Sequence, residues 1–443
     1  MFSKIFTRFP YPSTVRYIKD MILNVFIILI LVFQSFSCIK KEKTDLEYWS
    51  IGGSADLDYD PSELFNKNFD FTFKTISIPW TEHEKKILTS ILSGDPPDVI
   101  SEFAPLKSWA SRASLQPLDK FIEESNFDTN QFFSSLWGEM IWENQTFGIP
   151  VNTVSYALFY NKKIFAEVGI DTVPETWSDV IRFSREIDRF NSEGFLDRVG
   201  YLPNYGNLKT SNIIAWQLDH KFIDDDGEVN LNSNEMRTAF YWVKDFIDEI
   251  GLKNVLELMG TFGTGPQHGF ISEKVSMMIL DSSYPEIIEK YNPGLQYGVI
   301  PIPTFDDSGP VSSAGIWWLG IPRGAKNPQK SWKFISYLAG EKNQIDYQEK
   351  TEESLFSANK AAAYQSDYPT IPFYDVFLSM LENSKTPNII PLAHDKFWVE
   401  YHRAEERVIR TNVSIHTILN EAENEIQREL VKSKRYYEYL KNE

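Results

Sequence analysis

The stretch that decides the fold is TFGIPVNTVSYALFYNKKIFAEVGIDTVPETWSDVI, residues 146–181. Its middle, ALFYNK, reads as a strand, and Pro174-Glu175-Thr176-Trp177 reads as the start of a helix. Thr176 is predicted to cap that helix, and Asp179 at the third position places a negative charge near the helix N-terminus, where it is stabilising. The stretch therefore predicts a strand followed by a capped helix.

The same alternation is predicted on the N-terminal side of this stretch. LEYWSI from Leu46 and FTFKTISI at 71–78 read as strands, with helices expected at about 60–69 and from about Thr81. Gly94-Asp95-Pro96-Pro97 ends the second helix, because proline cannot continue it, and PPDVI leads into a third strand. Strands alternating with helices predict parallel α/β sheets, and 443 residues predict two lobes joined by short crossovers.

Composition excludes some classes of function. The formal net charge of −18 opposes binding to nucleic acid or anionic lipid. The 15% aromatic content, with 12 tryptophans, fits carbohydrate contact as well as ordinary cores. The six histidines show no metal-site spacing, and the sequence has no GxSxG elbow or P-loop, so neither an enzyme nor a cofactor is expected. Asp224-Asp225-Asp226-Gly227 reads as a β-turn and not as a calcium loop.

The N-terminus predicts export. Four basic residues and one acid in residues 1–20 precede about thirteen apolar residues from Met21 to Phe33, the length of a signal-peptide core. Cys38, the only cysteine, follows Ser37 and is predicted to carry a lipid after cleavage, although Ser35 and Phe36 match the usual processing motif loosely. A signal anchor over residues 21–39 and plain secretion are the alternatives, and all three export the rest of the chain.

Several motifs resemble those of extracellular solute-binding proteins of the sugar-binding family 1, the receptors of ABC importers. KILTSILSGDPPDVI from Lys86 is similar to one family signature, and residues 146–181 are similar to the longest family motif along its whole length. HKFIDDDGEVNLNSNEMRTAFYWVKDFIDE, GFISEKVSMMILDSSYPEII and YGVIPIPTFDDSGPVSSAGIWWLGIPRGAKNPQKSWKFISYLAG resemble further segments. The resemblance covers residues 45–430.

The resemblance implies an α/β, two-lobed periplasmic-binding-protein-like fold of type II, with a hinge and a ligand cleft between the lobes. It implies a signal peptide at 1–37, a tether at 38–44, lobe 1 at 45–152 and 317–367, and lobe 2 at 153–316 and 368–443. The implied ligand-binding residues are Ser50, Asp56, Glu102, Phe103, Asn152, Tyr156, Asn204, Tyr205, Asp281, Tyr284, Trp317 and Trp398. Those that follow lobe 1 strands could equally cap loops, and 204–207 could be a plain turn.

Trp317 and Trp318 are adjacent, and strand geometry predicts different roles for their side chains. In a strand their side chains point to opposite faces, so one can line a cleft while the other packs, and Trp317 fits the family's cleft position.

The resemblance further implies a monomeric protein that captures a mono- or oligosaccharide and delivers it to ABC-transporter membrane subunits by hinge closure. The lipid at Cys38 would anchor it to a bacterial membrane, on the periplasmic or cell-surface side. A non-sugar ligand such as a glycerol phosphodiester, polyamine or peptide, and a surface lipoprotein with no transport role, are the alternatives.

Overall fold

The computed structural model describes residues 45–51, 65, 67, 69–103, 105–206, 208–305, 308–351, 355–365, 372–386 and 389–441. The chain divides into two units, Met1–Asp45 and Leu46–Glu443, and every element named below belongs to the second. Cys38, Asp56 and most of the helix expected at 60–69 lie outside the described residues. In the described part of the chain, no helix has both the length and the apolar character needed to cross a bilayer.

One sheet organises the second unit. Within the described residues it has nine strands, of which six follow the order β10-β6-β11-β3-β1-β2. The remaining three pair at its sides: β9 and β12 with β6, and β13 with β11. The bounds are β1 Leu46–Ile51, β2 Phe73–Ile78, β3 Val99–Glu102, β6 Ile149–Asn161, β9 Met277–Asp281, β10 Tyr297–Ile300, β11 Ser312–Gly320, β12 Phe356–Ser357 and β13 Ser384–Lys385.

The direction of the strands differs from the sequence-based expectation in part of the sheet. β1 runs parallel to β2 and β3, as the alternation of strands and helices predicts. However, β11 is antiparallel to both β3 and β6, and β6 is antiparallel to β9 and β10. The expectation of purely parallel sheets was therefore wrong, because the long strands β6 and β11 traverse the sheet in opposite directions.

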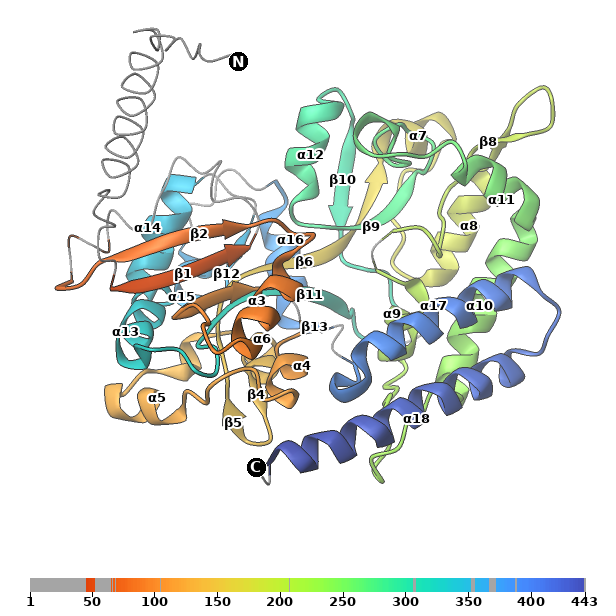
Figure 1. Cartoon of the computed structure of the whole chain (residues 1–443). Coiled ribbons are helices and arrows are strands. Elements are labelled where there is room, and N and C mark those ends of the chain that lie inside the picture. The colour runs from red at the N-terminus through yellow and green to blue at the C-terminus, as the bar shows by residue number, and fades with distance from the viewer. Residues whose placement is uncertain are drawn as a thin grey trace, which may run out of the picture. The chain divides into compact units, whose positions relative to one another are not determined.

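Strand β6 connects the two halves of the sheet. It has 13 residues, which corresponds to roughly 43 Å of extended chain, enough to serve two cores. Its first half pairs with β11, and its second half, from Tyr156, pairs with β9 and β10 (Figure 1). It ends where the Asn161 side chain accepts a hydrogen bond of 3.0 Å from the backbone N–H of Ile164 and so caps the next helix.

Helices cover both halves of the sheet (Figure 1). Those beside β1, β2 and β3 are α3 His83–Leu92, α4 Leu106–Ser111, α5 Asp119–Ser125, α6 Ser134–Trp137, α13 Pro328–Leu338, α14 Glu341–Thr351 and α15 Lys360–Tyr364. Those beyond β6 are α7 Lys162–Glu167, α8 Trp177–Ile187, α9 Thr210–Gln217, α10 Asn234–Ile250, α11 Leu252–Met259, α12 Tyr284–Tyr291, α17 His394–Arg410 and α18 Ile415–Lys441. Helix α16, Tyr374–Glu382, packs on β6. There are also two hairpins: β4 Ile141–Trp142 with β5 Gln145–Thr146, and β7 Arg189–Phe190 with β8 Leu196–Arg198.

Several local predictions are confirmed. Helix α8 begins with a capping box, in which the Thr176 side chain accepts from the Asp179 backbone and the Asp179 side chain accepts from the Thr176 backbone. Gly94 follows α3 with φ of +76°, a conformation that favours glycine. The Asp224–Gly227 segment is a turn, since the Gly227 N–H donates to the Asp224 carbonyl at 3.1 Å.

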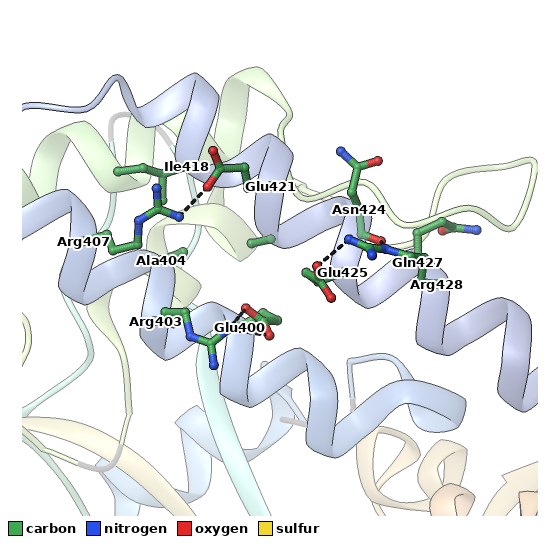
Figure 2. A pocket seen from close by; sticks show the side chains of 11 residues that line it. Glu400, Arg403, Ala404, Arg407, Ile418, Glu421, Asn424, Glu425, Gln427 and Arg428 are labelled. Carbon is green, nitrogen blue, oxygen red and sulfur yellow. Dashed lines mark hydrogen bonds and ion pairs between the residues drawn. The ribbon is translucent and has the colours of Figure 1, made fainter.

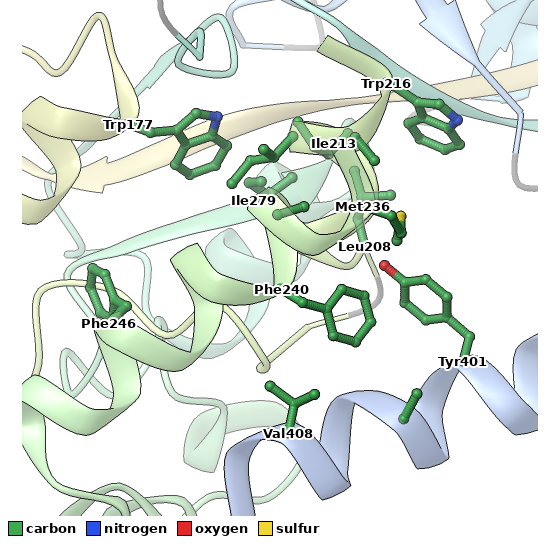
Figure 3. Close-up of a cluster of buried hydrophobic side chains, with 14 of the residues drawn as sticks. Trp177, Leu208, Ile213, Trp216, Met236, Phe240, Phe246, Ile279, Tyr401 and Val408 are labelled. Carbon is green, nitrogen blue, oxygen red and sulfur yellow. The ribbon is translucent and has the colours of Figure 1, made fainter. Parts of the chain in front are cut away.

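Separate hydrophobic cores lie in the two halves. One combines residues 46–149 with 314–381, and we call the part built around it lobe 1. A second, around Trp177, Phe240 and Tyr401, combines residues 158–302 with 390–430 and defines lobe 2 (Figure 3). A third lies mostly in lobe 2 and includes Phe377 of α16, while the next residue, Leu378, belongs to the lobe 1 core. The chain thus passes between the cores at β6, at β11 and near α16.

Candidate functional site

An aromatic cluster lies at the ends of the lobe 1 strands. Trp80 follows β2, Phe103 follows β3 and Trp317 lies within β11. The ring centroid of Phe103 is 4.5 Å from that of Trp317 and 5.6 Å from that of Trp80. Trp80 is 47% exposed, although an indole is largely apolar. Phe103 and Trp317 are half-buried, and partly exposed rings of this kind offer flat faces on which an apolar or sugar-like surface can stack.

A buried acid–imidazole pair lies beside these rings. The His83 Nδ1 atom is 2.5 Å from the Glu102 Oε1 atom, and the His83 ring lies edge-on to Trp80. Burial raises the pKa of Glu102, a rise that the hydrogen bond from His83 opposes, and the same bond raises the pKa of His83. The Glu102 Oε2 atom is buried and has no hydrogen-bond partner among the described residues. We refer to Trp80, His83, Glu102, Phe103 and Trp317 together as the aromatic cluster.

A second group lies in lobe 2, where β6 and β9 pair. Tyr156 on β6 lies opposite Asp281 at the end of β9, and α12 begins three residues later at Tyr284. Together with Tyr205 and His268 they line a cavity of about 300 Å³, which we call the tyrosine pocket. The His268 ring is 5.7 Å from Tyr205 and 5.3 Å from Tyr284, centroid to centroid. Sequence-distant segments thus converge on one cavity that carries both rings and polar groups.

The polar groups of the tyrosine pocket are held in defined states. Asp281 Oδ1 accepts hydrogen bonds from the Ser283 N–H at 2.9 Å and from the Ser283 hydroxyl. Burial raises the pKa of Asp281. Burial, together with the charge of Asp281, raises the pKa of Tyr156 and raises that of Tyr284 to about 12, so both phenols stay protonated at neutral pH. Burial lowers the pKa of His268 and favours its neutral form.

Another cavity, of about 210 Å³, lies between lobe 1 residues and α17. We call it the apolar pocket, because its lining includes Phe103, Met140, Ile316, Trp318 and Trp398. Trp398 is held on α17 by Phe397, Tyr401 and His402, whose ring centroids lie 5.1 to 5.7 Å from its own. The polar residues that line the apolar pocket include Glu139, Thr386 and His394. Residues of both lobes therefore meet at this pocket.

A larger cavity has a different character. It measures about 690 Å³ and lies between α17 and α18, as Figure 2 shows. Its arginines are already paired: Arg407 with Glu421 at 2.6 Å, Arg403 with Glu400 at 2.8 Å, and Arg428 with Glu425. Such a self-neutralised groove offers few unused charges to a ligand. The described residues also hold no group of three or more His, Cys, Asp or Glu side chains placed to bind a metal ion.

The structure brings together most of the residues expected in the cleft. Tyr156, Tyr205, Asp281 and Tyr284 share the tyrosine pocket, while Phe103 and Trp398 share the apolar pocket. Glu102 and Trp317 adjoin Phe103. Trp317 and Trp318, neighbours on β11, differ in burial. Trp318 is 1% exposed and packs in the core, whereas Trp317 is half-buried.

Besides Glu102 and Trp317, three further expected residues line neither pocket. Ser50 lies on β1 opposite Ser77, and Asn152 is buried on β6 opposite Trp317. Asn204 is half-buried beside the tyrosine pocket, where its Nδ2 atom contacts Met259 Sδ at 3.9 Å and its buried Oδ1 atom has no partner among the described residues. None of these three lines a cavity described here.

Sequence reasoning missed Trp80, His83 and His268. Trp80 had a usable signal, because it directly follows a predicted strand in ISIPW, at the edge where ligands of α/β proteins bind. His83 lies three residues after Trp80, at the start of α3, and its role is visible only through its contact with Glu102. His268 lies in a loop whose sequence, GTGPQHGF, gives no indication of its contact with Tyr284.

Comparisons with known proteins agree with this geometry. The family model described as bacterial extracellular solute-binding protein matches residues 52–345. A putative binding protein of Brucella abortus is 23% identical over 339 residues, covering 74% of this chain and 78% of that protein. The galactooligosaccharide-binding protein of Bacillus subtilis is 21% identical over 296 residues, covering 66% and 68%.

Solved structures show the same fold. The sugar-binding protein MalE from Xanthomonas citri matches with a TM-score of 0.72 at 20% identity, covering 89% of this chain and 99% of that chain. CpMnBP1 with mannotriose bound matches with a TM-score of 0.71 at 20% identity, covering 86% and 99%. At this identity the likeness establishes the architecture, while the matching family model covers well over half of the chain.

Proposed function

Because the chain belongs to the bacterial extracellular solute-binding protein family, we propose that it captures a mono- or oligosaccharide between its two lobes. The observation that carries this proposal is the pairing of exposed or half-buried rings with polar groups along the same two strands. Trp317 lies on β11 and Tyr156 on β6, and these strands also connect the lobes. Sugar rings present apolar faces to aromatic side chains and hydroxyls to polar ones, so the two kinds of group are needed together.

The residues have separate roles in this proposal. Phe103, Trp317 and Trp398 supply stacking faces, and the phenols of the tyrosine pocket donate hydrogen bonds to sugar oxygens. Asp281 accepts hydrogen bonds from sugar hydroxyls. The names of two matched proteins support a saccharide, since one binds galactooligosaccharide and another was solved with mannotriose.

We propose that the protein delivers its ligand to an ABC importer by closing its two lobes about a hinge. We propose lobe boundaries at 45–152 with 317–367 and at 153–316 with 368–443. Most residues of the two main cores lie within these ranges, while Ala314, Ile316, Leu378 and Leu381 of the lobe 1 core lie in the ranges proposed for lobe 2. Closure around β6 and β11 would bring the aromatic cluster and the tyrosine pocket onto one ligand, and the closed form would be read by the membrane subunits. The family is one of binding proteins, and no covalent step is needed for this task.

Membrane attachment is part of the same proposal. Residues 1–37 act as a signal peptide, and Cys38 carries the lipid that anchors a monomer outside the cytoplasm, with 38–44 as a tether. Replacing Cys38 by Ala should move the protein from the membrane fraction to the soluble exported fraction. Retention of the variant in the membrane would support a signal anchor over residues 21–39 instead.

The ligand is tested by thermal unfolding of the chain from residue 39 with a panel of mono- and oligosaccharides. A ligand that binds only the folded state raises the melting temperature in a saturable way. The shift should disappear in Trp317→Ala and Trp398→Ala and remain in Tyr241→Ala, which changes an exposed ring on α10. A flat response from well-folded protein would favour a non-sugar solute or a surface lipoprotein with no transport role.

A further inference from the structure

Carboxylates predominate in and beside the two pockets that contain the expected ligand-binding residues. Asp281 lines the tyrosine pocket, Glu139 lines the apolar pocket, and the fully buried Glu102 lies next to Phe103. Among the described lining residues of both pockets there is no lysine and no arginine. The two lining histidines, His268 and His394, are held in the neutral form because burial lowers the pKa of each.

Two cationic side chains beside the apolar pocket are paired with carboxylates. Lys107 Nζ lies 3.0 Å from Glu139 Oε1 and so compensates the one carboxylate that lines the apolar pocket. Arg112 is shared between Glu84 at 3.5 Å and Asp395 at 3.3 Å.

Lys209, which follows the loop that carries Tyr205, is likewise committed. Its Nζ atom lies 3.2 Å from Glu405 Oε2, and Glu405 is 4% exposed. The other carboxylate oxygen of Glu405 accepts a hydrogen bond from the Ser211 hydroxyl at 3.1 Å. Moving Lys209 toward a ligand would leave this buried carboxylate without its cation, which is costly.

An anionic ligand would therefore enter a pocket that already holds a carboxylate and has no lysine or arginine among its described lining residues. A buried charge is tolerated only when it is paired, and like charges brought together across an interface cost several kcal/mol in binding. A sugar hydroxyl is attracted to Asp281 instead of repelled, because it can donate a hydrogen bond to the carboxylate. The net charge of −18 adds a long-range repulsion of the same sign.

We propose that this binding protein rejects anionic solutes and that Asp281 is the residue that sets the rejection. The inference rests on the proposed saccharide function and narrows it. The ligand is an uncharged, hydroxyl-donating saccharide, and phosphorylated sugars, uronic acids and glycerol phosphates are excluded. Asp281 acts on specificity through its charge and its position opposite Tyr156.

Matched pairs of probes test the proposal on the full chain in mild detergent. Calorimetric titrations compare galactose with galacturonate, mannose with mannose 6-phosphate, and glycerol with sn-glycerol 3-phosphate. We expect every anionic probe to bind at least about tenfold more weakly than its neutral counterpart, or not at all. In Asp281→Asn, which keeps an oxygen that can accept from Ser283, the anionic probes should gain affinity relative to the neutral ones. Asp226→Asn removes an exposed turn carboxylate and should leave the selectivity unchanged.

The outcomes separate this inference from the proposed function. An anionic probe that binds as tightly as its neutral counterpart overturns the rejection, as does selectivity that persists unchanged in a folded Asp281→Asn protein. If Asp281→Asn fails to fold, Asp281→Ser replaces it, with the same expected gain for the anionic probes. Absence of binding by every neutral probe would count against the proposed saccharide function, whereas binding of an anionic probe by Asp281→Asn alone would still support the rejection by Asp281.

Discussion

Two carboxyl groups beside the expected binding residues are accommodated in different ways. In the aromatic cluster of lobe 1, Glu102 is fully buried and hydrogen-bonded to the imidazole of His83. In the tyrosine pocket of lobe 2, Asp281 faces neutral donors, and the described lining holds no lysine or arginine. One oxygen of the first carboxyl is paired with an imidazole inside the protein, whereas the second carboxyl lines a pocket where a ligand can donate to it. The comparison indicates that Glu102 contributes mainly to structure and Asp281 mainly to ligand selection.

The largest expected effect on stability comes from breaking the compensated pair. His83→Leu leaves Glu102 buried without its partner, and we expect the free energy of unfolding at pH 7 to fall by about 2–4 kcal/mol. Urea denaturation measures the change, with His416→Leu, an exposed histidine on α18, as the matched control. Equal effects of the two substitutions would show that the pair does not stabilise lobe 1.

The next effect is on ligand binding. Trp398→Ala removes the indole from the apolar pocket, and we expect saccharide affinity to fall by about 2 kcal/mol, roughly thirtyfold. Titration calorimetry gives the change, and Tyr241→Ala serves as the control for an aromatic ring outside the pockets. Unchanged affinity in Trp398→Ala would place the ligand away from the contact between α17 and lobe 1.

Asp281→Asn should have the opposite sign from His83→Leu. Burial raises the folded-state pKa of Asp281 above the unfolded value of 3.8, so its favourable contribution exists only at low pH and is lost as pH rises through the raised pKa. At pH 7 the ionised side chain is a cost, and replacing it with Asn should raise the free energy of unfolding by up to about 1 kcal/mol. A clear loss of stability, measured by urea denaturation, would mean that Asp281 is compensated as fully as Glu102.

The smallest expected effect is the pH dependence of the His83 pair. The folded-state pKa of His83 is raised above its unfolded value of 6.5, chiefly by Glu102 and also by the charge of Glu84. The resulting stabilisation is fully present below pH 6.5 and is lost as pH rises through the folded pKa. The melting temperature of the wild type relative to His83→Gln should therefore fall by roughly 2 °C between pH 6 and pH 8. A difference that is constant over this range would contradict the raised pKa.

The sequence predicted the parts of this structure that depend on neighbouring residues. The capping box at Thr176 and Asp179, the glycine after α3 and the turn at Asp224 are local features, and all are present. The shared location of Tyr156 and Asp281 follows from the resemblance to the family. These predictions required no knowledge of side-chain packing.

The remaining parts depend on contacts between distant segments. Glu102 was expected to bind ligand, but its pairing with His83 joins the first residue of α3 to the last residue of β3 and has no sequence signature. His268 reaches Tyr284 through the fold of lobe 2. The antiparallel direction of β11 relative to β3 follows from the path of the chain between the lobes, which local strand and helix patterns do not specify.

The central claim is that one neutral saccharide is held by both the aromatic cluster and the tyrosine pocket. The most direct test is a calorimetric titration of the tightest-binding neutral saccharide into three proteins: the wild type, Trp317→Ala in lobe 1 and Tyr156→Phe in lobe 2. We expect one binding site in the wild type and weaker binding in both variants, since each removes a contact to the same ligand. Weakening in only one of two folded variants would contradict the claim, because the ligand would then be held by a single lobe.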